Sequence, residues 1–388
     1  MPRPVVVLSS ALASPTTGGG VIVCETVRHL AADRPVTLVC PEFAHQQEEA
    51  RVARRTTVSA GARMMTVTPR QGRGMKRFTL RRALSPQPGV SFNLAHQKAR
   101  RVVAEVLAGN PSAQVLSIGP FAAAMLPDDS MLPRVHVCLI DVSERIIETD
   151  HARLLRRLDA RIERHKVKHY ERAVVLRAGA VGAISKPDAE FMSTITKRPS
   201  IVWLPPLITP RAITREAVEP RTVLFTTNYT YHHSRRAARW FLEDVWPHMP
   251  FGYRLWVTGR DSTGGELAEL CRTTEAATYH GLLALPELDA LYARCAVAVN
   301  PTLSGSGVQM KLMDALSRGV PVVTGSLSNP FGVMLRTART PEEWVSAIVA
   351  EEHRASSFNY SAYITDATAR WTNWLDCKGG DRVDRLSE

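Results

Sequence analysis

Short apolar runs rich in valine alternate with amphipathic helix patterns along almost the whole chain. Near the amino end, "PVVVLSS" predicts a buried strand, "GVIVCETVRHLAA" a helix and "PVTLVC" a second strand. A second series of the same kind begins with "TVLFTTN" and continues through "YRLWVTG" and "AVAVNP". Repeated strand–helix–strand units build parallel sheets with helices on both faces. The sequence therefore predicts an α/β protein with two doubly wound, Rossmann-like domains.

The two series are separated by a proline-rich stretch with little periodicity, which predicts a linker at residues 205–220. Residues 1–204 then form the first domain and residues 221–356 the second. Two domains suit a length of 388 residues, which is about twice a common domain size. We expect residues 357–388 to form a C-terminal helix followed by a polar tail.

The apolar runs and the cysteines indicate the cellular compartment of the protein. No apolar run approaches the roughly 18 residues that a membrane span needs. The first residues lead directly into a strand pattern, without the apolar core and cleavage site of a signal peptide. The six cysteines are scattered and form no CxxC motif, which indicates reduced, mostly buried thiols. These features predict a cytoplasmic protein.

The positive charge is concentrated in residues 51–101, the basic block. It holds thirteen lysines or arginines and no acidic residue, in a chain of net charge +12. Its segment "RGMKRFTLRRAL" also mixes apolar residues among the cations. Such a segment is either a solvated loop or a binding surface for an anionic membrane or an acidic acceptor. Nucleic acid is the weakest alternative, because no nucleic-acid fold signature accompanies the charge.

The stretch "NPTLSGSGVQMKLMDALSRGVPVVTG", Asn300 to Gly325, predicts a strand, a flexible loop, a helix and another strand. Glycines at a strand-to-helix turn let a ligand approach the backbone, and free amides at a helix start suit a phosphate. Lys311 is placed to reach the same phosphate. Asp314 could accept hydrogen bonds from the two hydroxyls of a ribose. The alternative is a capped helix start followed by a surface Lys–Asp pair, because GxG at a turn is a weak signal.

This stretch resembles the donor-binding segment of GT-B glycosyltransferases of group 1, which has the pattern "GSGVxxKxLEAMAxGxPVV". Further segments resemble the same family: "VLFTTNYTYHHSRRAARWFLEDVWPHM", "RLWVTGRD" and "YHGLLALPELDALYARCAVAVNP" in the second half, and "SPTTGGGVIVCETVRHLA" and "CLIDVSERI" in the first. The likeness covers most of the chain, is strongest over residues 223–325 and is weakest in the basic block. It implies the GT-B fold, with two Rossmann-like domains facing a cleft and a last helix that crosses back to the first domain.

The resemblance also implies site residues. A nucleotide-diphosphate sugar would dock on the C-terminal domain, and the acceptor would enter over the N-terminal domain. Two residues depart from the retaining family-four pattern: Asp314 replaces a glutamate, and Ser306 stands where the EX7E signature has another, so the stereochemical outcome stays open. The implied donor-binding residues are Gly259, Arg260, His280, Gly281, Gly305, Ser306, Gly307, Val308, Lys311 and Asp314. The implied cleft-loop residues are Gly18, Gly19, Gly20, Asn228 and His232.

Catalysis without a metal ion is expected, because helix amides and a lysine can stabilise a leaving diphosphate. The sequence contains no D-x-D motif of the metal-dependent type, and His232 and His233 lack a third ligand at zinc spacing. An inverting enzyme also needs a general base. Asp141, at the end of the strand pattern "VHVCLID", is the first candidate and Glu144 the second. Asp141 could instead cap a helix, or position the acceptor in a retaining reaction.

The predicted function is that of a metal-independent glycosyltransferase, of hexosyltransferase type, with no cofactor besides its nucleotide-sugar donor. The expected acceptor is a hydroxyl of a lipid-linked glycan or a polysaccharide, reached at the cytoplasmic face of a membrane. One alternative keeps the fold but not the transfer, as in a sugar-nucleotide epimerase or a non-catalytic nucleotide-sugar-binding protein. Another is a basic membrane- or nucleic-acid-binding protein. The base, the sugar, the acceptor and the oligomeric state are not predicted.

Overall fold

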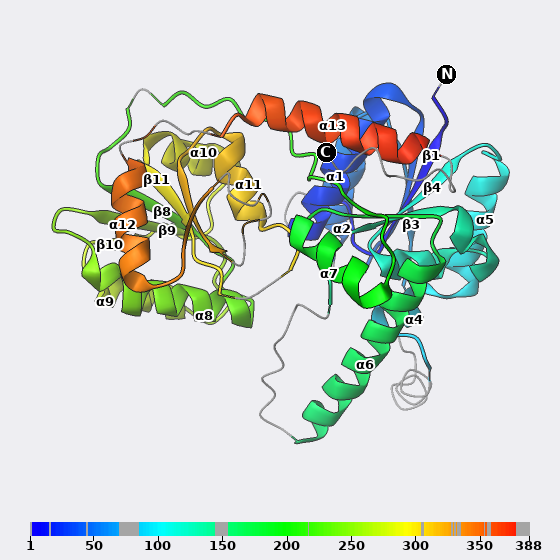
Figure 1. Ribbon diagram of the computed structural model, residues 1–388, viewed down its shortest axis with the longest axis horizontal. Helices are drawn as coiled ribbons and strands as arrows, with labels where there is room; N and C mark the ends of the chain where they lie inside the picture. The colour runs from blue at the N-terminus through cyan, green and yellow to red at the C-terminus, as the bar shows by residue number, and fades with distance from the viewer. Residues whose placement is uncertain are drawn as a thin grey trace. The chain divides into compact units, whose positions relative to one another are not determined.

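The chain divides into two units in the computed structural model, which describes residues 2–377 except 15–16, 44–45, 70–84, 144–153, 216, 304–305, 327–328, 330, 332–334, 353 and 355–357. Unit 1 consists of Met1–Ile208 and Asp366–Glu388, and unit 2 of Thr209–Thr365. Each unit has a central sheet with helices on its faces (Figure 1). The predicted fold class, two doubly wound α/β domains, is confirmed within each unit.

Unit 1 contains a seven-stranded sheet in the order β3-β2-β1-β4-β5-β6-β7 among its described residues. Every neighbouring pair is parallel. β1 and β5 are buried at every position, as expected of strands that helices cover on both faces. The strands are β1 (Val5–Ser9), β2 (Val36–Pro41), β3 (Arg63–Val67), β4 (Gln114–Ile118), β5 (Val135–Leu139), β6 (Ala180–Ala183) and β7 (Ile201–Trp203).

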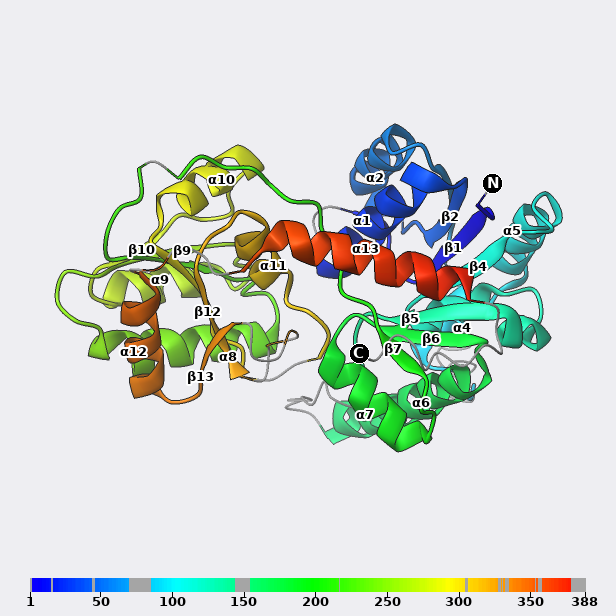
Figure 2. The same ribbon diagram turned by 45° about the horizontal axis from the view of Figure 1, so that its top comes forward.

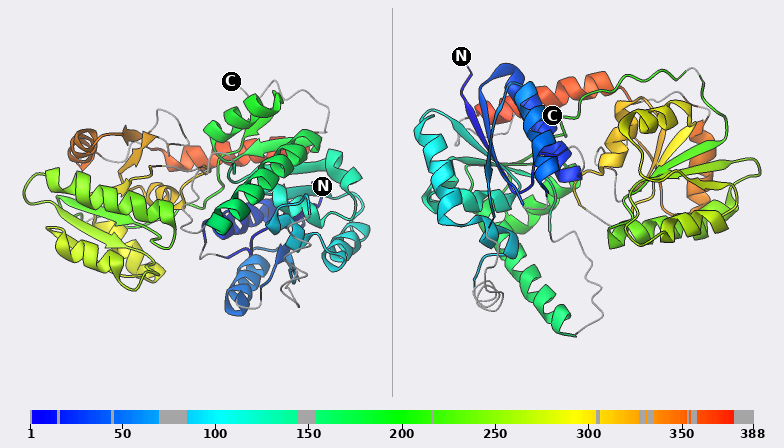
Figure 3. Two further views of the ribbon diagram at one scale, coloured as in Figure 1. Left: turned by 90° about the horizontal axis from the view of Figure 1, so that it is seen from below. Right: turned by 180° about the vertical axis from the view of Figure 1, so that it is seen from behind.

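The helices of unit 1 begin where the sequence supplies helix-start residues. Thr17 caps α1, since its hydroxyl accepts a hydrogen bond from the amide of Gly20, and Pro187 lies in the first turn of α7. The amino-terminal part of α6 extends well beyond the sheet of its unit (Figure 3). The helices are α1 (Gly18–Asp33), α2 (Gln47–Ser59), α4 (Gly89–Leu94), α5 (Gln97–Ala108), α6 (Leu154–Arg177) and α7 (Lys186–Thr196), with 3-10 turns η2 (Pro120–Met125) and η3 (Asp129–Arg134).

Unit 2 contains a six-stranded sheet in the order β10-β9-β8-β11-β12-β13 among its described residues, again with parallel neighbours. The stretch "SRRAARWFLEDVWPHM", residues 234–249, has the pattern of a single amphipathic helix. It is instead α8 (His232–Trp240) followed by the π-turn η4 (Phe241–Val245) and the 3-10 turn η5 (Trp246–His248), because Pro247 lacks an N–H and cannot continue an α-helix.

The remaining elements of unit 2 follow the predicted alternation. The strands are β8 (Thr222–Thr226), β9 (Arg254–Thr258), β10 (Ala277–Tyr279), β11 (Val297–Asn300), β12 (Val322–Gly325) and β13 (Arg336–Ala338). The helices are α9 (Glu266–Thr273), α10 (Leu285–Arg294), α11 (Met310–Ser317) and α12 (Pro341–Glu352). An apolar core that includes Phe225, Phe241 and Trp344 fills the space between this sheet and its helices.

The last helix, α13 (Tyr360–Asp376), begins in unit 2 and ends in unit 1. Its carboxyl half packs on unit 1 (Figure 2). There the indole of Trp371 donates to the carbonyl of Pro205 (2.9 Å), and Arg34 pairs with Asp376 (2.9 Å). Four aromatic side chains of α13 are buried and therefore pack in the fold: Tyr360, Tyr363, Trp371 and Trp374.

The segment predicted as a linker, residues 205–220, is held by contacts with both units. Residues 205–208 are buried and belong to unit 1. Further along, Arg215 donates to the carbonyls of Tyr292 (2.7 Å) and Cys295 (3.0 Å) in unit 2. The proline-rich composition therefore marks the crossing between the units, where the first four residues are buried and Arg215 is held by hydrogen bonds.

Two expectations from composition can be compared with the structure. Five cysteines are buried and Cys377 is half-buried, and none of them forms a disulfide in the described part of the chain. No helix among the described residues is long and apolar enough to cross a bilayer.

Candidate active site

The donor-binding residues inferred from sequence gather at the carboxyl edge of the unit 2 sheet. Because the sheet is parallel, the loops that follow its strands all emerge at this edge. The neighbouring strands β10, β9, β8 and β11 are followed by His280 and Gly281, by Gly259 and Arg260, by Asn228, and by Ser306 and Gly307. The predicted residues, which lie between Asn228 and Gly307 in the sequence, thus form one row of loops.

Gly259 ties three of these loops together through its backbone. Its amide donates to the carbonyl of Gly281 (2.9 Å), and its own carbonyl accepts from the hydroxyl of Tyr279 (2.7 Å). Its φ of +133° lies in the region that favours glycine, and a Cβ would lie 1.7 Å from the carbonyl oxygen of Thr227. Gly259 therefore brings the ends of β8 and β9 into direct backbone contact.

Replacing Gly259 with alanine is expected to destabilise unit 2 by about 3 kcal/mol or more, because the clash with backbone adds to the strain of a positive φ. Gly281→Ala is the matched control: its φ is also positive, at +73°, but nothing lies within 4 Å of the added Cβ. Thermal unfolding should show the larger drop for Gly259→Ala. Equal decreases in the unfolding temperature of the two variants would mean that the close approach to Thr227 does not contribute to the effect.

Arg260 and His280 present side chains at the same edge. The Arg260 side chain is exposed and has no hydrogen bond or ion pair with any described residue, although its carbonyl accepts from the amide of Tyr229 (2.8 Å). His280 packs edge-on to Trp256, with ring centroids 6.2 Å apart. Partial burial, and secondly the charge of Arg294, lower the pKa of His280 below its usual value. Near neutral pH this edge thus offers one cation and one neutral imidazole.

The loop after β11 adopts the conformation that close approach to a ligand requires. Gly307 has φ +73°, Ser306 is half-exposed, and Val308 is buried against the unit. The helix that follows begins at Met310, slightly later than the sequence pattern suggested, because Gly307 interrupts the helical backbone. The predicted phosphate-binding residue Gly305 lies outside the described residues.

Lys311, the second residue of α11, is the only lysine in the sequence of unit 2. Its Nζ lies 5.4 Å from the centre of the Phe225 ring, near the carboxyl end of β8. The side chain is half-buried and forms no ion pair with a described residue, and burial lowers its pKa to about 8. A shielded ammonium without a counter-charge is a natural partner for an anion.

Asp314 does not pair with Lys311, as the surface-pair alternative required, but with Arg318. Nη1 of Arg318 lies 3.3 Å from Oδ1 of Asp314, and Arg318 also binds Asp289 at 2.6 Å. The Arg318 side chain is fully buried, whereas that of Asp314 is 42% exposed. Burial raises the pKa of Asp314, and the Arg318 guanidinium opposes this rise. Sequence reasoning missed Arg318, although its position one helical turn after Asp314 is a detectable signal.

Asn228 and His232 lie at the start of the first helix of unit 2. The Asn228 side chain accepts from the amide of Thr230 (3.2 Å), which shapes the turn after β8. His232 is the first residue of α8 and is exposed. No group of three or more His, Cys, Asp or Glu side chains that could hold a metal ion occurs in the described part of the chain.

In unit 1, Gly18, Gly19 and Gly20 were predicted to form a loop, but they are the first three residues of α1, because Thr17 caps the helix there, and they lie beside the end of β5. A Cβ on Gly20 would lie 2.4 Å from the carbonyl of Ser14, so Gly20 is needed for packing. A Cβ on Gly19 would only touch Ile140 at 3.7 Å, and Gly18 is exposed. Packing thus accounts for Gly20, whereas Gly18 and Gly19 line an accessible surface next to the residue that precedes Asp141.

Asp141 follows β5 by two residues and remains partly accessible. Burial raises its pKa to about 6, and the neighbouring carboxylate of Asp188 on α7 contributes to the rise. The residues 141–143 are not helical, so the alternative of a helix cap directly at Asp141 is not supported. Sequence reasoning missed Asp188, which is buried in the first turn of α7. The second candidate base, Glu144, lies outside the described residues.

Comparison with known proteins bears on the fold and on the family resemblance. Residues 220–350 match the model of the family described as glycosyl transferases group 1. No curated protein matches the chain. Among solved structures, a mutant of TarM from S. aureus, in complex with fondaparinux, alpha-GlcNAc-glycerol and UDP, shares 8% identity with a TM-score of 0.69, covering 97% of this chain and all of that one.

Two further solved structures have the same fold. HepE from Anabaena, in complex with UDP, shares 12% identity with a TM-score of 0.57, covering 96% of this chain and 97% of that one. Sucrose-phosphate synthase from Thermosynechococcus elongatus shares 11% identity with a TM-score of 0.59, covering 96% and 94%. These comparisons confirm the predicted GT-B fold and the predicted resemblance to group 1 glycosyltransferases.

Proposed function

We propose that this GT-B glycosyltransferase moves a sugar from a nucleotide-diphosphate donor to a hydroxyl of a glycan acceptor. The observation that carries the proposal is the row of loops at the carboxyl edge of unit 2, where Lys311 and Arg260 have no counter-charge among the described residues. The UDP complexes of TarM and HepE support a nucleotide-sugar donor. The first test is protection of the protein against heating by UDP and GDP, compared with the nucleosides.

The chemistry follows from where charge develops. As the bond between the anomeric carbon and the diphosphate oxygen breaks, negative charge grows on the diphosphate. We assign its stabilisation to Lys311, Arg260 and the backbone amides of Ser306 to Val308, while Asp314 binds the ribose. The new bond joins the acceptor oxygen to the anomeric carbon. In an inverting reaction Asp141 takes the acceptor's proton, and in a retaining reaction the leaving diphosphate oxygen takes that proton while Asp141 positions the acceptor.

A metal ion is not needed in this proposal, since two cations and the amides neutralise the leaving group. Transfer activity should therefore change less than twofold when EDTA replaces magnesium in the assay. The measurement is product formation at saturating donor in both buffers, with a metal-dependent transferase as the control. Loss of activity in EDTA that magnesium or manganese restores would contradict this part of the proposal.

The acceptor is proposed to be lipid-linked or polysaccharide, reached by peripheral binding of the basic block to an anionic membrane. The described parts of the block expose basic side chains on α2 and α5, namely Arg51, Arg54, Arg55, Lys98 and Arg101. The segment with the densest charge, residues 73–82, lies outside the described residues.

Deleting residues 73–82 is expected to reduce co-sedimentation with phosphatidylglycerol vesicles at least tenfold, because it removes five of the basic residues. Nucleotide binding to unit 2 should be unchanged in the same variant, which serves as its folding control. Undiminished vesicle binding would mean that the block is a solvated loop.

A second candidate function is binding or epimerisation of a nucleotide sugar without transfer. It is favoured by the ion pair of Asp314 with Arg318, and by Ser306 at a position where retaining relatives have a glutamate. Consumption of donor in the presence of a crude membrane fraction, with release of free nucleotide, separates transfer from both alternatives.

A further inference from the structure

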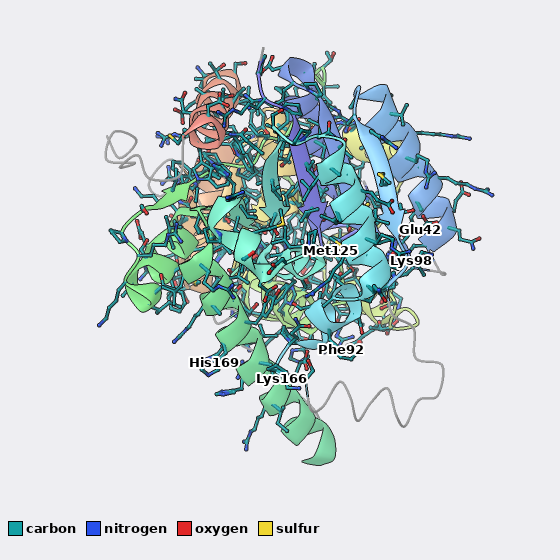
Figure 4. The ribbon with its side chains drawn as sticks, turned by 90° about the vertical axis from the view of Figure 1, so that its right-hand side faces the viewer. Glu42, Phe92, Lys98, Met125, Lys166 and His169 are labelled. Carbon is teal, nitrogen blue, oxygen red and sulfur yellow. The ribbon has the colours of Figure 1, made fainter. Side chains whose placement is uncertain are left out.

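A surface cavity of about 420 Å³ lies on unit 1. Its lining includes neither Asp141 nor any of the three glycines at the start of α1. Most of its lining residues lie on one face of α5, the segment after η2 contributes one more, and the space is open to solvent. Figure 4 looks onto this side of the unit, with Lys98 of α5 and Met125 of η2 labelled. The lining residues are Ala95, Gln97, Arg100, Arg101, Ala104 and Pro127.

The polar part of the lining is positive. It consists of the Gln97 amide and the guanidinium groups of Arg100 and Arg101, and no carboxylate of a described residue lines the cavity. The Nε of Arg100 is buried and has no hydrogen-bond acceptor. Neither arginine forms an ion pair with any residue that the structure describes. Because the two guanidinium groups carry positive charge without a described counter-charge, a ligand that supplies anionic acceptor oxygens would be bound favourably.

The carboxylate of Asp128, the residue after Pro127, does not neutralise the charge of the two arginines. The pKa of Asp128 is lowered, first by hydrogen bonds from Ser130 and only then by the charges of Arg100 and Arg177. The amide of Ser130 donates to Asp128 at 2.9 Å, which holds that carboxylate in its own turn. The charge of Arg100 therefore contributes to lowering the pKa of Asp128, but the two side chains form no ion pair.

We propose that this cavity binds a phosphate, sulfate or carboxylate group carried by a sugar of the acceptor, an inference that rests on the proposed transfer to a glycan. Guanidinium groups match the geometry of these anions better than ammonium groups do. The volume exceeds what a lone anion fills, and Ala95, Ala104 and Pro127 give the remainder an apolar wall against which a sugar ring can lie. The acceptor is thereby an anionic glycan.

The binding test uses the full chain saturated with UDP, so that the donor site is filled. Glucose 6-phosphate is the probe, with glucose and inorganic phosphate as comparison arms, and saturation-transfer NMR with a concentration series gives the affinity. Glucose 6-phosphate should bind at least tenfold more tightly than either comparison compound. Equal binding of inorganic phosphate would overturn the sugar part of the inference, and equal binding of glucose the anionic part.

Two variants localise the site. The double variant Arg100→Gln with Arg101→Gln should weaken glucose 6-phosphate binding by roughly 10- to 100-fold, because each lost charge-assisted hydrogen bond counts. Lys98→Gln, on the same helix but outside the lining, should change it less than twofold. Ala104→Phe keeps the charges and fills the cavity, and should block the sugar phosphate. Equal losses for Lys98→Gln and the double variant would show diffuse surface attraction and overturn the inference.

The outcome can be separated from that of the proposed function. If UDP itself does not bind, the donor site is wrong, and the glucose 6-phosphate titration without UDP still reports on the cavity. If UDP binds and turns over donor but the arginine variants retain full affinity for glucose 6-phosphate, only the acceptor assignment fails. Circular dichroism and thermal unfolding of each variant establish that it is folded.

Discussion

Lys311→Ala is expected to weaken nucleoside diphosphate binding by roughly 10- to 100-fold, since a charge-assisted hydrogen bond in a shielded site contributes about 1.5–3 kcal/mol. The ammonium lies over Phe225 and has no carboxylate partner among the residues that the structure describes, so it is available to the ligand rather than to the fold. Transfer should fall by more than binding, because the leaving diphosphate carries more charge in the transition state than in the bound donor. Calorimetric titration with UDP measures the change in affinity, and steady-state kinetics measure the change in the transfer rate.

The control for this prediction is Lys186→Ala, which removes an exposed lysine of unit 1 and should change neither quantity. Lys311→Arg should keep most of the affinity, since it keeps the charge. The pH dependence has a definite sign. Anion binding raises a lysine pKa that burial holds at about 8, so affinity should be full below pH 8 and fall as pH rises above it. An unchanged affinity in Lys311→Ala would remove the basis of the donor site.

Asp141→Asn is expected to lower kcat by about 10²- to 10⁴-fold if Asp141 is the general base, while UDP affinity stays within twofold. With a pKa of about 6, the carboxylate of the free enzyme is charged at neutral pH and can accept the acceptor's proton. The value of kcat/KM should therefore rise with pH up to about 6 and then level off. Proton NMR of the product anomer at early times establishes whether the reaction inverts.

Asp129→Asn, an exposed substitution of the same kind in the same unit, is the control and should leave kcat unchanged. Asp188→Asn removes the like charge that raises the pKa of Asp141, and should move the acid limb to lower pH. A kcat reduced less than fivefold in Asp141→Asn would exclude it as the base. A raised acceptor KM with unchanged kcat would instead identify a positioning residue.

Much of the fold was predictable because the strands are short, buried and separated by helices of clear period. The strand patterns that became β1, β2, β8, β9 and β11 needed no tertiary information, since parallel strands covered on both faces are apolar at nearly every position. The π-turn after α8 was not predicted. Pro247 is visible in the sequence and shows that the helix cannot continue, but a proline alone does not specify that the preceding residues form a π-turn.

The site was predictable to the extent that it depends on loops after parallel strands. Gly259 was selected by resemblance alone, and its structural reason, the approach of the Thr227 carbonyl, depends on the neighbouring strand. Arg318 and Asp188 were missed because their significance lies in contacts across elements, with Asp289 from α10 and with Asp141 after β5. The sequence predicts which residues lie at the carboxyl edge of the sheet. It does not predict which charged side chains pair across elements, because that depends on how the elements pack.

The central claim is that the ammonium of Lys311 contacts the diphosphate of the donor, and the titration of this one group tests it most directly. With 13C-methylated lysines and Lys311→Arg to assign the signal, NMR should show Lys311 titrating near pH 8 in the free protein. Saturating UDP in the presence of EDTA should move that pKa above 10. A Lys311 signal that titrates identically with and without bound UDP would contradict the account.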